Sequence, residues 1–268
     1  MTYISLSVGD LAVGALLIVA NGILSLGLGL KLERTLLIST FRMIVQLTLV
    51  GYVLTAVFEL SSPFWTGTIA AVMIVFAGYE VSARQERRLV GVWSYGLGAT
   101  AMMFSSTLVT VLALTTQIGP SPWYDPQYAI PLLGMVLGNS MTGIALGLNT
   151  LTSNLARDRI AIEAQLCLGA SRWTACGPML RAAIRTGMMP MINAMAAAGL
   201  VSLPGMMTGQ IMAGVPPTEA VRYQILIMFL IVGATGLGVL MTVFGGLAYL
   251  TDTRHRLRLD RLKQSRMT

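Results

Sequence analysis

The chain has 268 residues, of which 55% are hydrophobic and only 11% are charged, and its mean hydropathy is +0.73. A water-soluble domain carries about 25% charged residues, so this composition excludes an ordinary soluble protein and indicates a polytopic membrane protein. The formal net charge of +7 comes mainly from arginines that lie between and after the apolar stretches.

Seven apolar stretches are predicted to cross the membrane as helices, because each reaches or approaches the roughly 20 apolar residues that a span needs. Strands of an outer-membrane barrel are a poor alternative, since these stretches are too long and too continuous. The chain is therefore predicted to be all-α, with a single transmembrane domain over residues 1–268. The predicted spans are 9–30, 36–58, 63–83, 92–116, 128–150, 186–212 and 223–250.

The charges predict how these spans are oriented. Lysine and arginine crowd the predicted loops 31–35, 84–90 and 151–185 and the tail 251–268, whereas the opposite side receives only Arg222. The positive-inside rule makes the basic side cytoplasmic, with the N-terminus outside and the C-terminus inside. We expect a multi-pass protein of the bacterial cytoplasmic (inner) membrane, whose basic tail rests near anionic headgroups and binds no nucleic acid.

Few residues in the chain could carry out chemistry. His255 is the single histidine, and neither of the two lysines follows a glycine, so the phosphate-binding GxxxxGK[ST] loop is absent. We therefore expect no enzyme activity and no cofactor on this chain, and we can name no metal ligands. Glu80 is the one acid near a span. An end-of-helix carboxylate beside Arg84 is favoured for it over an ion relay.

The predicted cytoplasmic loop 151–185 contains a helix, a break and a second helix. One face of the first helix is apolar. Its residues are Ile160, Ala164, Cys167 and Leu168. Gly169 then interrupts the helix, and Ser171 can cap a second one that begins at Arg172. An amphipathic pair lying at the membrane interface would show the same pattern.

This loop resembles the EAA…G cytoplasmic loop of ABC importer-type permeases. The resemblance rests on Glu163-Ala164, followed five residues after Ala164 by Gly169-Ala170, although Gln165 replaces the second alanine and the usual Leu-Pro is absent. In those permeases the loop docks into a groove on a separate ATP-hydrolysing subunit. The resemblance implies that coupling to an ATPase involves Glu163, Ala164, Gly169, Ala170 and Ser171.

The predicted sixth span is interrupted by Pro204-Gly205. Proline removes a backbone donor, and an unpaired backbone group in hydrocarbon costs several kcal/mol, so we expect the break to face protein or a water-filled cavity. Broken helices also present polar groups to transported substrates. A tightly packed kink is the alternative, since Gly205 and Gly209 form a GxxxG pattern. The predicted translocation path is lined by Ser202, Pro204, Gly205, Met206, Met207 and Gln210, with Asn139 and Asn193 as further candidates.

Three stretches together resemble the FetB-type permease family. They are FRMIVQLTLVGYVL (41–54), GMVLGNSMTGIALGLNTL (134–151) and GLVSLPGMMTGQIMAGVPPTEAVRYQI (199–225). Bacterial members are the membrane subunit of an ABC exporter linked to iron, and plant relatives are linked to aluminium tolerance and to UDP-glucose transport. The resemblance implies a homodimeric permease with two P-loop ATPase subunits, on which ATP and Mg would be bound.

Several features leave the cargo and the mechanism open. The sixth span is rich in methionine, whose thioethers suit softer metals than iron, so a chelated metal, a nucleotide sugar or another polar solute remains a candidate cargo. GxxxG patterns at Gly134/Gly138 and Gly143/Gly147 permit close helix contacts but do not establish a dimer. A stand-alone secondary carrier or channel for a polar solute is the alternative function.

Overall fold

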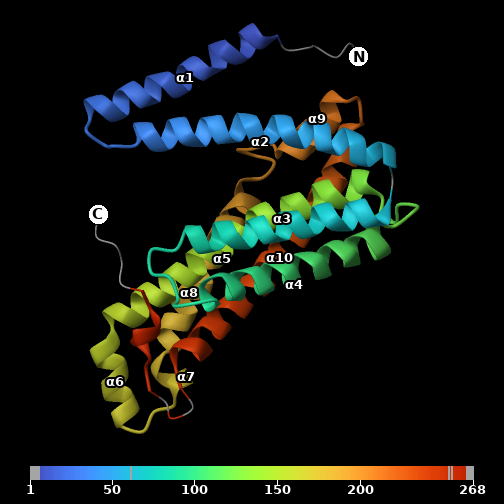
Figure 1. The fold of residues 1–268 in the computed structure, drawn as a ribbon. Coiled ribbons are helices and arrows are strands. Elements are labelled where there is room, and N and C mark those ends of the chain that lie inside the picture. Colours follow the sequence, from blue (N-terminus) through green and yellow to red (C-terminus); the bar gives the residue numbers. More distant parts are fainter. Residues whose placement is uncertain (1–6, 61, 253, 255, 264–268) are drawn as a thin grey trace. The chain divides into compact units, whose positions relative to one another are not determined.

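The computed structural model of this protein describes residues 7–60, 62–252, 254 and 256–263. Among these residues the regular elements are helices (Figure 1). The chain divides into two compact units, Met1–Ser61 and Ser62–Thr268. Residues 1–6, together with 253, 255 and 264–268 of the predicted tail, lie outside the described residues.

The first unit consists of α1 (Val8–Gly27) and α2 (Glu33–Leu60). Ser7 and Asp10 begin α1 with a capping box, in which the Asp10 amide donates to Ser7 Oγ and the Ser7 amide donates to Asp10 Oδ2. Ser25 Oγ donates to Glu33 Oε2 at 3.0 Å and joins the two helices. Most large apolar side chains of both helices are exposed, as expected where the surrounding solvent is lipid.

Five long helices form the core of the second unit. They are α3 (Pro63–Ala83), α4 (Trp93–Ala113), α5 (Pro126–Arg157), α8 (Gly177–Ala197) and α10 (Pro217–Leu250). A π turn, η1 (Leu114–Ile118), follows α4. Leu, Ile, Val and Met side chains from these helices fill two buried clusters. Apolar packing of residues far apart in the sequence therefore builds this unit.

Small residues allow the helices of the second unit to approach closely. A Cβ added at Gly143 would lie 2.7 Å from the carbonyl oxygen of Gly187 and 2.6 Å from Thr235 Cγ2. At Gly147 the added Cβ would be 3.4 Å from the carbonyl oxygen of Ala183. The Gly143/Gly147 pattern of α5 thus serves contacts with α8 and α10 within one chain, whereas a Cβ added at Gly138 of the Gly134/Gly138 pattern would have no neighbour within 4 Å.

Six helices in the described part of the chain are long and apolar enough to cross a membrane. They match all the predicted spans except 186–212. That segment is two pieces, because α8 ends at Ala197 and α9 (Gly205–Met212) begins after a break at 198–204. At eight residues, α9 rises only about 12 Å, too little for a core of about 30 Å.

Helix α8 covers the first part of the predicted sixth span, residues 186–197, and begins earlier, at Gly177. Its 21 residues are long enough for a span, but Arg181, Arg185 and Asn193 make it less apolar than the six helices above, and it is not among them. The count of seven spans and their orientation stay predictions. The observed fold is that of an all-helical, polytopic membrane protein.

The predicted cytoplasmic loop 151–185 is shorter in the structure, since α5 continues to Arg157 and α8 already begins at Gly177. Between them lie α6 (Arg159–Cys167) and α7 (Arg172–Ala175). Figure 1 shows α6, α7 and the red C-terminal segment at one end of the second unit and α9 at the other. The loops that were predicted to be cytoplasmic in this unit therefore share one end.

The C-terminal segment is folded against the protein. We call the described residues of 251–263 the C-terminal clasp. The Val90 amide donates to the Arg261 carbonyl and the Lys263 amide to the Arg88 carbonyl, both at 2.8 Å. Apolar side chains of the clasp also pack against the larger core cluster. They are Leu257, Leu259 and Leu262. A tail that only rests near headgroups, as expected from its charge, does not describe these residues.

Aromatic and charged contacts close the clasp onto α10. The Tyr249 ring stacks on Trp93 with centroids 4.8 Å apart, and the Arg261 guanidinium lies 5.1 Å from the Tyr249 ring centroid. The Tyr249 hydroxyl donates to the Val90 carbonyl at 3.2 Å. Because the Arg256 backbone amide donates to its carboxylate, the pKa of Asp252 is lower than usual. The clasp thus joins the α3–α4 loop to the end of α10.

Candidate functional site

Backbone hydrogen bonds join the residues of the break between α8 and α9 to one another and to the end of α8. Gly199 has a φ of +86°, in the left-handed region that glycine tolerates. The Val201 and Ser202 amides both donate to the Ala197 carbonyl, at 3.0 and 3.1 Å, and the Gly199 amide donates to the Ser202 carbonyl at 2.9 Å. These amides are therefore paired within the break and are not offered to a ligand.

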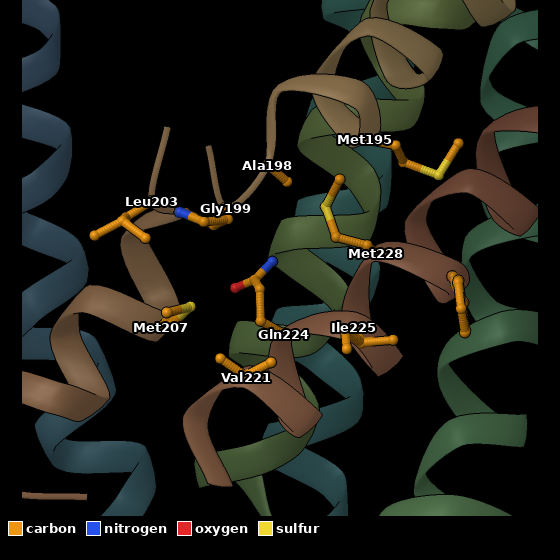
Figure 2. A pocket seen from close by; sticks show the side chains of 11 residues that line it. Met195, Ala198, Gly199, Leu203, Met207, Val221, Gln224, Ile225 and Met228 are labelled. Carbon is orange, nitrogen blue, oxygen red and sulfur yellow. The ribbon is translucent and has the colours of Figure 1, made fainter. Parts of the chain in front are cut away.

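A cavity of about 450 Å³ lies beside this break. Its walls come from the end of α8, the break, α9 and the first turns of α10 (Figure 2). The α10 residues of the lining fall at positions i, i+3, i+4, i+7 and i+8 counted from Val221, which places them on one helix face. The lining residues are Met195, Ala198, Gly199, Leu203, Pro204, Met207, Val221, Gln224, Ile225, Met228 and Phe229. Apart from one amide, this lining is apolar.

Gln224 is the polar side chain of the cavity. It is 8% exposed, and its Oε1 is buried with no hydrogen-bond donor among the described residues. In Figure 2 its amide points into the space between Leu203 and Met207 on one side and Met228 on the other. Sequence reasoning missed this residue, although it is the one amide side chain in α10. Its position within an otherwise apolar, uncharged stretch was the available signal.

The structure brings two of the predicted path residues, Pro204 and Met207, to the cavity wall. The other residues of that segment lie elsewhere. Ser202 is exposed, and Met206 packs against the smaller core cluster. Gln210 is not part of the lining. A transport role for these residues stays a prediction.

The remaining path candidates are separate from the cavity. The Asn139 amide nitrogen donates to the Met135 carbonyl at 2.7 Å, a bond within α5, and Asn193 is exposed on α8. A Cβ added at Gly205 or Gly209 would have no neighbour within 4 Å. The alternative in which these two glycines form a tight packing face therefore does not describe the second unit.

One face of helix α6 packs against the larger core cluster, and the opposite face is exposed, which we call its bare face. Ile162 is 1% exposed and, with the partly buried Leu166, belongs to the larger core cluster. On the opposite face Ile160 is 84% and Leu168 is 88% exposed. Ala164 and Cys167, predicted to share that face, are exposed as well. The apolar face of α6 therefore has no partner among the described residues.

The turn after α6 has the local structure that the sequence predicts. Gly169 has a φ of +90°, and the Ala170 amide donates to the Gln165 carbonyl at 3.1 Å, which closes the end of the helix. Ser171 Oγ then accepts from the Thr174 amide at 3.2 Å and caps α7. Glu163 forms an ion pair with Arg159 at 2.8 Å on the surface of α6.

Helix α7 joins α6 to α10 and the clasp. The Trp173 ring lies 5.9 Å from the Phe244 ring of α10, and Arg172 Nη1 donates to the Asp252 carbonyl at 3.4 Å. Cys176, which follows α7, is fully buried in the core cluster, and burial raises its pKa to about 11. Helix α7 therefore contacts both α10 and the clasp.

Acidic residues offer no clear ion site. Glu80 lies 3.9 Å from Arg84 in an i,i+4 pair at the end of α3, which is the arrangement favoured for it above. Among the described residues there is no group of three or more His, Cys, Asp or Glu that could hold a metal ion. The geometry therefore offers an apolar cavity with one amide, and a bare helix face at the other end of the unit.

Comparison with known proteins places this chain in a family. Residues 8–250 match the family described as Uncharacterised protein family (UPF0014). A UPF0014 membrane protein of Synechocystis sp. is 42% identical over 207 residues, which cover 76% of this chain and 78% of the relative. The probable iron export permease protein FetB of Escherichia coli is 30% identical over 259 residues, covering 95% and 96% of the two chains.

A plant relative is also similar. The protein ALUMINUM SENSITIVE 3 of Arabidopsis thaliana is 32% identical over 216 residues, covering 79% of this chain and 76% of its own. No solved structure matches this chain. The apolar helices and the bacterial membrane relatives together identify a multi-pass protein of the inner membrane. The chain belongs to the UPF0014 family of membrane proteins, as its resemblance to FetB-type permeases predicted.

Proposed function

We propose that this chain is the permease subunit of an ABC exporter for iron or another metal, driven by a separate P-loop ATPase. The cargo and direction follow from the relative named as a probable iron export permease, which is similar over nearly the full chain. The observation that carries the link to an ATPase is the bare apolar face of α6, in the segment that resembles the EAA loop.

Two properties make α6 suited to docking. Its Ile162 and Leu166 hold it to the core, so a force applied to its other face would move the transmembrane helices rather than only α6. That other face exposes Ile160 and Leu168 almost completely, outside the six candidate spans. A contiguous exposed apolar face favours an interaction surface, with a partner protein or with the membrane interface, and the resemblance to the EAA loop favours the partner protein.

The proposed mechanism uses the contacts of α7. ATP binding would bring two ATPase subunits together and displace α6 in each of two permease copies. Trp173 would pass that displacement to Phe244 of α10, and Arg172 would pass it to Asp252 of the clasp. Because α10 also forms one wall of the cavity, nucleotide binding at one end would alter the cavity at the other. ATP and Mg would remain on the ATPase.

A stand-alone carrier is the competing function. It would need an ionisable group within the membrane for ion coupling. Glu80 is the candidate, and its ion pair with Arg84 at the end of α3 suits a structural role better than a proton or ion relay. We therefore propose only the ATP-driven function.

Co-purification of the ATPase tests the proposal. The tagged chain is isolated in mild detergent from its native host, and the bound P-loop ATPase is identified by mass spectrometry. Ile160→Glu should release that ATPase because it places a charge on the bare face. Gln165→Glu adds the same charge to the same helix about 140° away from Ile160 and should retain the partner. A wild-type chain that purifies without an ATPase, or an Ile160→Glu variant that keeps it, contradicts the proposal.

A further inference from the structure

The clasp lies where three candidate spans end. Helix α3 ends at Ala83, α4 begins at Trp93 and α10 ends at Leu250, and all three are long and apolar enough to cross a membrane. Trp93 is 52% exposed and stacks on Tyr249, and these two residue types are enriched at the boundary between a membrane and water. The clasp, drawn in red in Figure 1, therefore lies at the level of the lipid headgroups.

Two cations face each other where the clasp joins the α3–α4 loop. Leu89 and Leu262 form an antiparallel bridge, and both side chains pack in the larger core cluster. Side chains alternate between the two faces of an extended strand, so the flanking Arg88 and Lys263 point away from that core, and both are exposed. The Lys263 amide donates to the Arg88 carbonyl at 2.8 Å, which places these two residues directly opposite one another.

No carboxylate balances these two charges in the described part of the chain. Each aspartate of the clasp forms an ion pair with an arginine of the clasp itself. Glu86 is the one acid of the α3–α4 loop, and it forms no ion pair with either of these described cations. Arg88 Nη2 donates to the Ala83 carbonyl at 3.2 Å, an acceptor that leaves the charge in place. Since like charges directly opposite each other destabilise an antiparallel pair, an anion bound between them would stabilise the bridge.

An apolar hollow lies beside the clasp. It has a volume of about 240 Å³ and is lined by Val92, Trp93, Gly96, Leu97 and Thr100 at the start of α4. The stacked rings of Trp93 and Tyr249 and the Arg261 guanidinium above Tyr249 connect the hollow to the clasp. Val92 is 81% exposed. An anion that carries an apolar body therefore fits this surface better than a small inorganic anion does, and at this depth the bilayer supplies such anions.

We propose that Arg88 and Lys263 bind the phosphate of an anionic membrane phospholipid whose acyl chains enter the hollow on α4, and that the bound lipid holds the clasp closed. Because the clasp and the α3–α4 loop each supply one cation, the site exists only while the two are paired. Lipid binding therefore stabilises the closed clasp relative to an open one. The inference goes beyond the proposed function and does not depend on an ATPase.

Amide exchange of the whole chain in nanodiscs tests the inference. One set of discs contains phosphatidylcholine alone, and the other also contains phosphatidylglycerol. The Val90 and Lys263 amides report on the bridge because each donates a hydrogen bond across it. We expect phosphatidylglycerol to slow their exchange about 5- to 30-fold, the factor for one or two basic residues that engage an anionic lipid surface.

Substitution of Lys263 should act in opposite directions in the two lipids. In phosphatidylcholine, Lys263→Gln removes the repulsion from Arg88 and should slow exchange of the Val90 amide. In discs with phosphatidylglycerol it removes a contact with the lipid and should accelerate that exchange. Loss of a purely structural contact would not reverse sign in this way. Arg88→Gln is the second variant, and it should remove the response to phosphatidylglycerol as well.

Arg254→Gln is the matched control. It removes the same charge from an exposed position of the clasp, but Arg254 lies outside the Leu89–Leu262 bridge, so the response to phosphatidylglycerol should persist. Each variant is compared at equal monodispersity, so that an unfolded variant is recognised. An equal loss of the response in Arg254→Gln and Lys263→Gln would show a diffuse attraction of the whole tail and overturn the inference.

Three other results would also overturn it. Exchange of the wild-type bridge that is indifferent to phosphatidylglycerol would leave no role for the lipid. Equal protection by inorganic phosphate in phosphatidylcholine discs would assign the two cations to a soluble anion. Protection that appears only after the ATPase is added would assign them to an acidic surface of that partner. Because the main comparison contains no ATPase, its outcome is independent of the co-purification test.

Discussion

The contact between α5 and α8 gives the sharpest prediction about stability. In Gly143→Ala the new Cβ would lie 2.6 Å from Thr235 Cγ2 and 2.7 Å from the Gly187 carbonyl oxygen. The threonine side chain can shift, but the carbonyl belongs to the backbone of α8, so that the two helices must separate. Overpacking of this kind costs about 1–3 kcal/mol, a factor of about 5–150 in the folding equilibrium.

The assay is thermal unfolding in detergent, followed by tryptophan fluorescence. For a unit of this size the expected decrease in Tm is about 2–12 °C. Gly138→Ala is the matched control. It lies on the same helix, and its added Cβ would have no neighbour within 4 Å, so alanine should leave Tm unchanged or raise it through its higher helix propensity. Equal melting of Gly143→Ala and the wild type would refute the close α5–α8 contact.

Three further predictions concern the end of the second unit that carries α6, α7 and the clasp. Ser171→Ala should remove the cap of α7 and destabilise that turn by about 1 kcal/mol, whereas Ser171→Gly should cost only a few tenths; amide exchange of residues 171–176 would distinguish them. Tyr249→Phe removes the hydroxyl bond to the Val90 carbonyl but keeps the stacked ring, so exchange at residues 88–90 should accelerate by the equivalent of about 1 kcal/mol. With a pKa of about 11, Cys176 should be about 0.1% thiolate at pH 8 and should label with maleimide only as the pH rises toward that value. Exposed Cys167 should account for the labelling at pH 8, and persistent labelling of a Cys167→Ser variant at that pH would contradict the burial of Cys176.

Much of the helix pattern could be predicted because it depends on local properties. The predicted span 63–83 matches α3 to the residue. Pro63 and Arg84 bound this apolar stretch, and in lipid a helix lets a single stretch pair its own backbone N–H and C=O groups. The turn at Gly169 and the cap at Ser171 were predictable for a similar reason, because each needs only hydrogen bonds within a few residues.

The candidate site was only partly predictable. Pro204 marks the broken helix in the sequence, yet the break starts earlier, at Ala198, where Gly199 supplies the left-handed turn. Of the side chains expected to face a path, Met206 turned to the core and Met207 to the cavity. Residues adjacent in the sequence differ by about 100° around a helix, and without the neighbouring helix nothing in the sequence says which direction is inward.

The sequence by itself determined that this is a helical membrane protein with a helix–turn–helix between α5 and α8, because apolar length and local hydrogen bonding are properties of short segments. Only the tertiary structure decided that Gln224 of α10 meets Met207 of α9 in one cavity, that Gly143 contacts Gly187, and that the clasp closes on residues 88–90. Those pairings join residues distant in the chain, and they depend on how the surfaces of whole helices fit together.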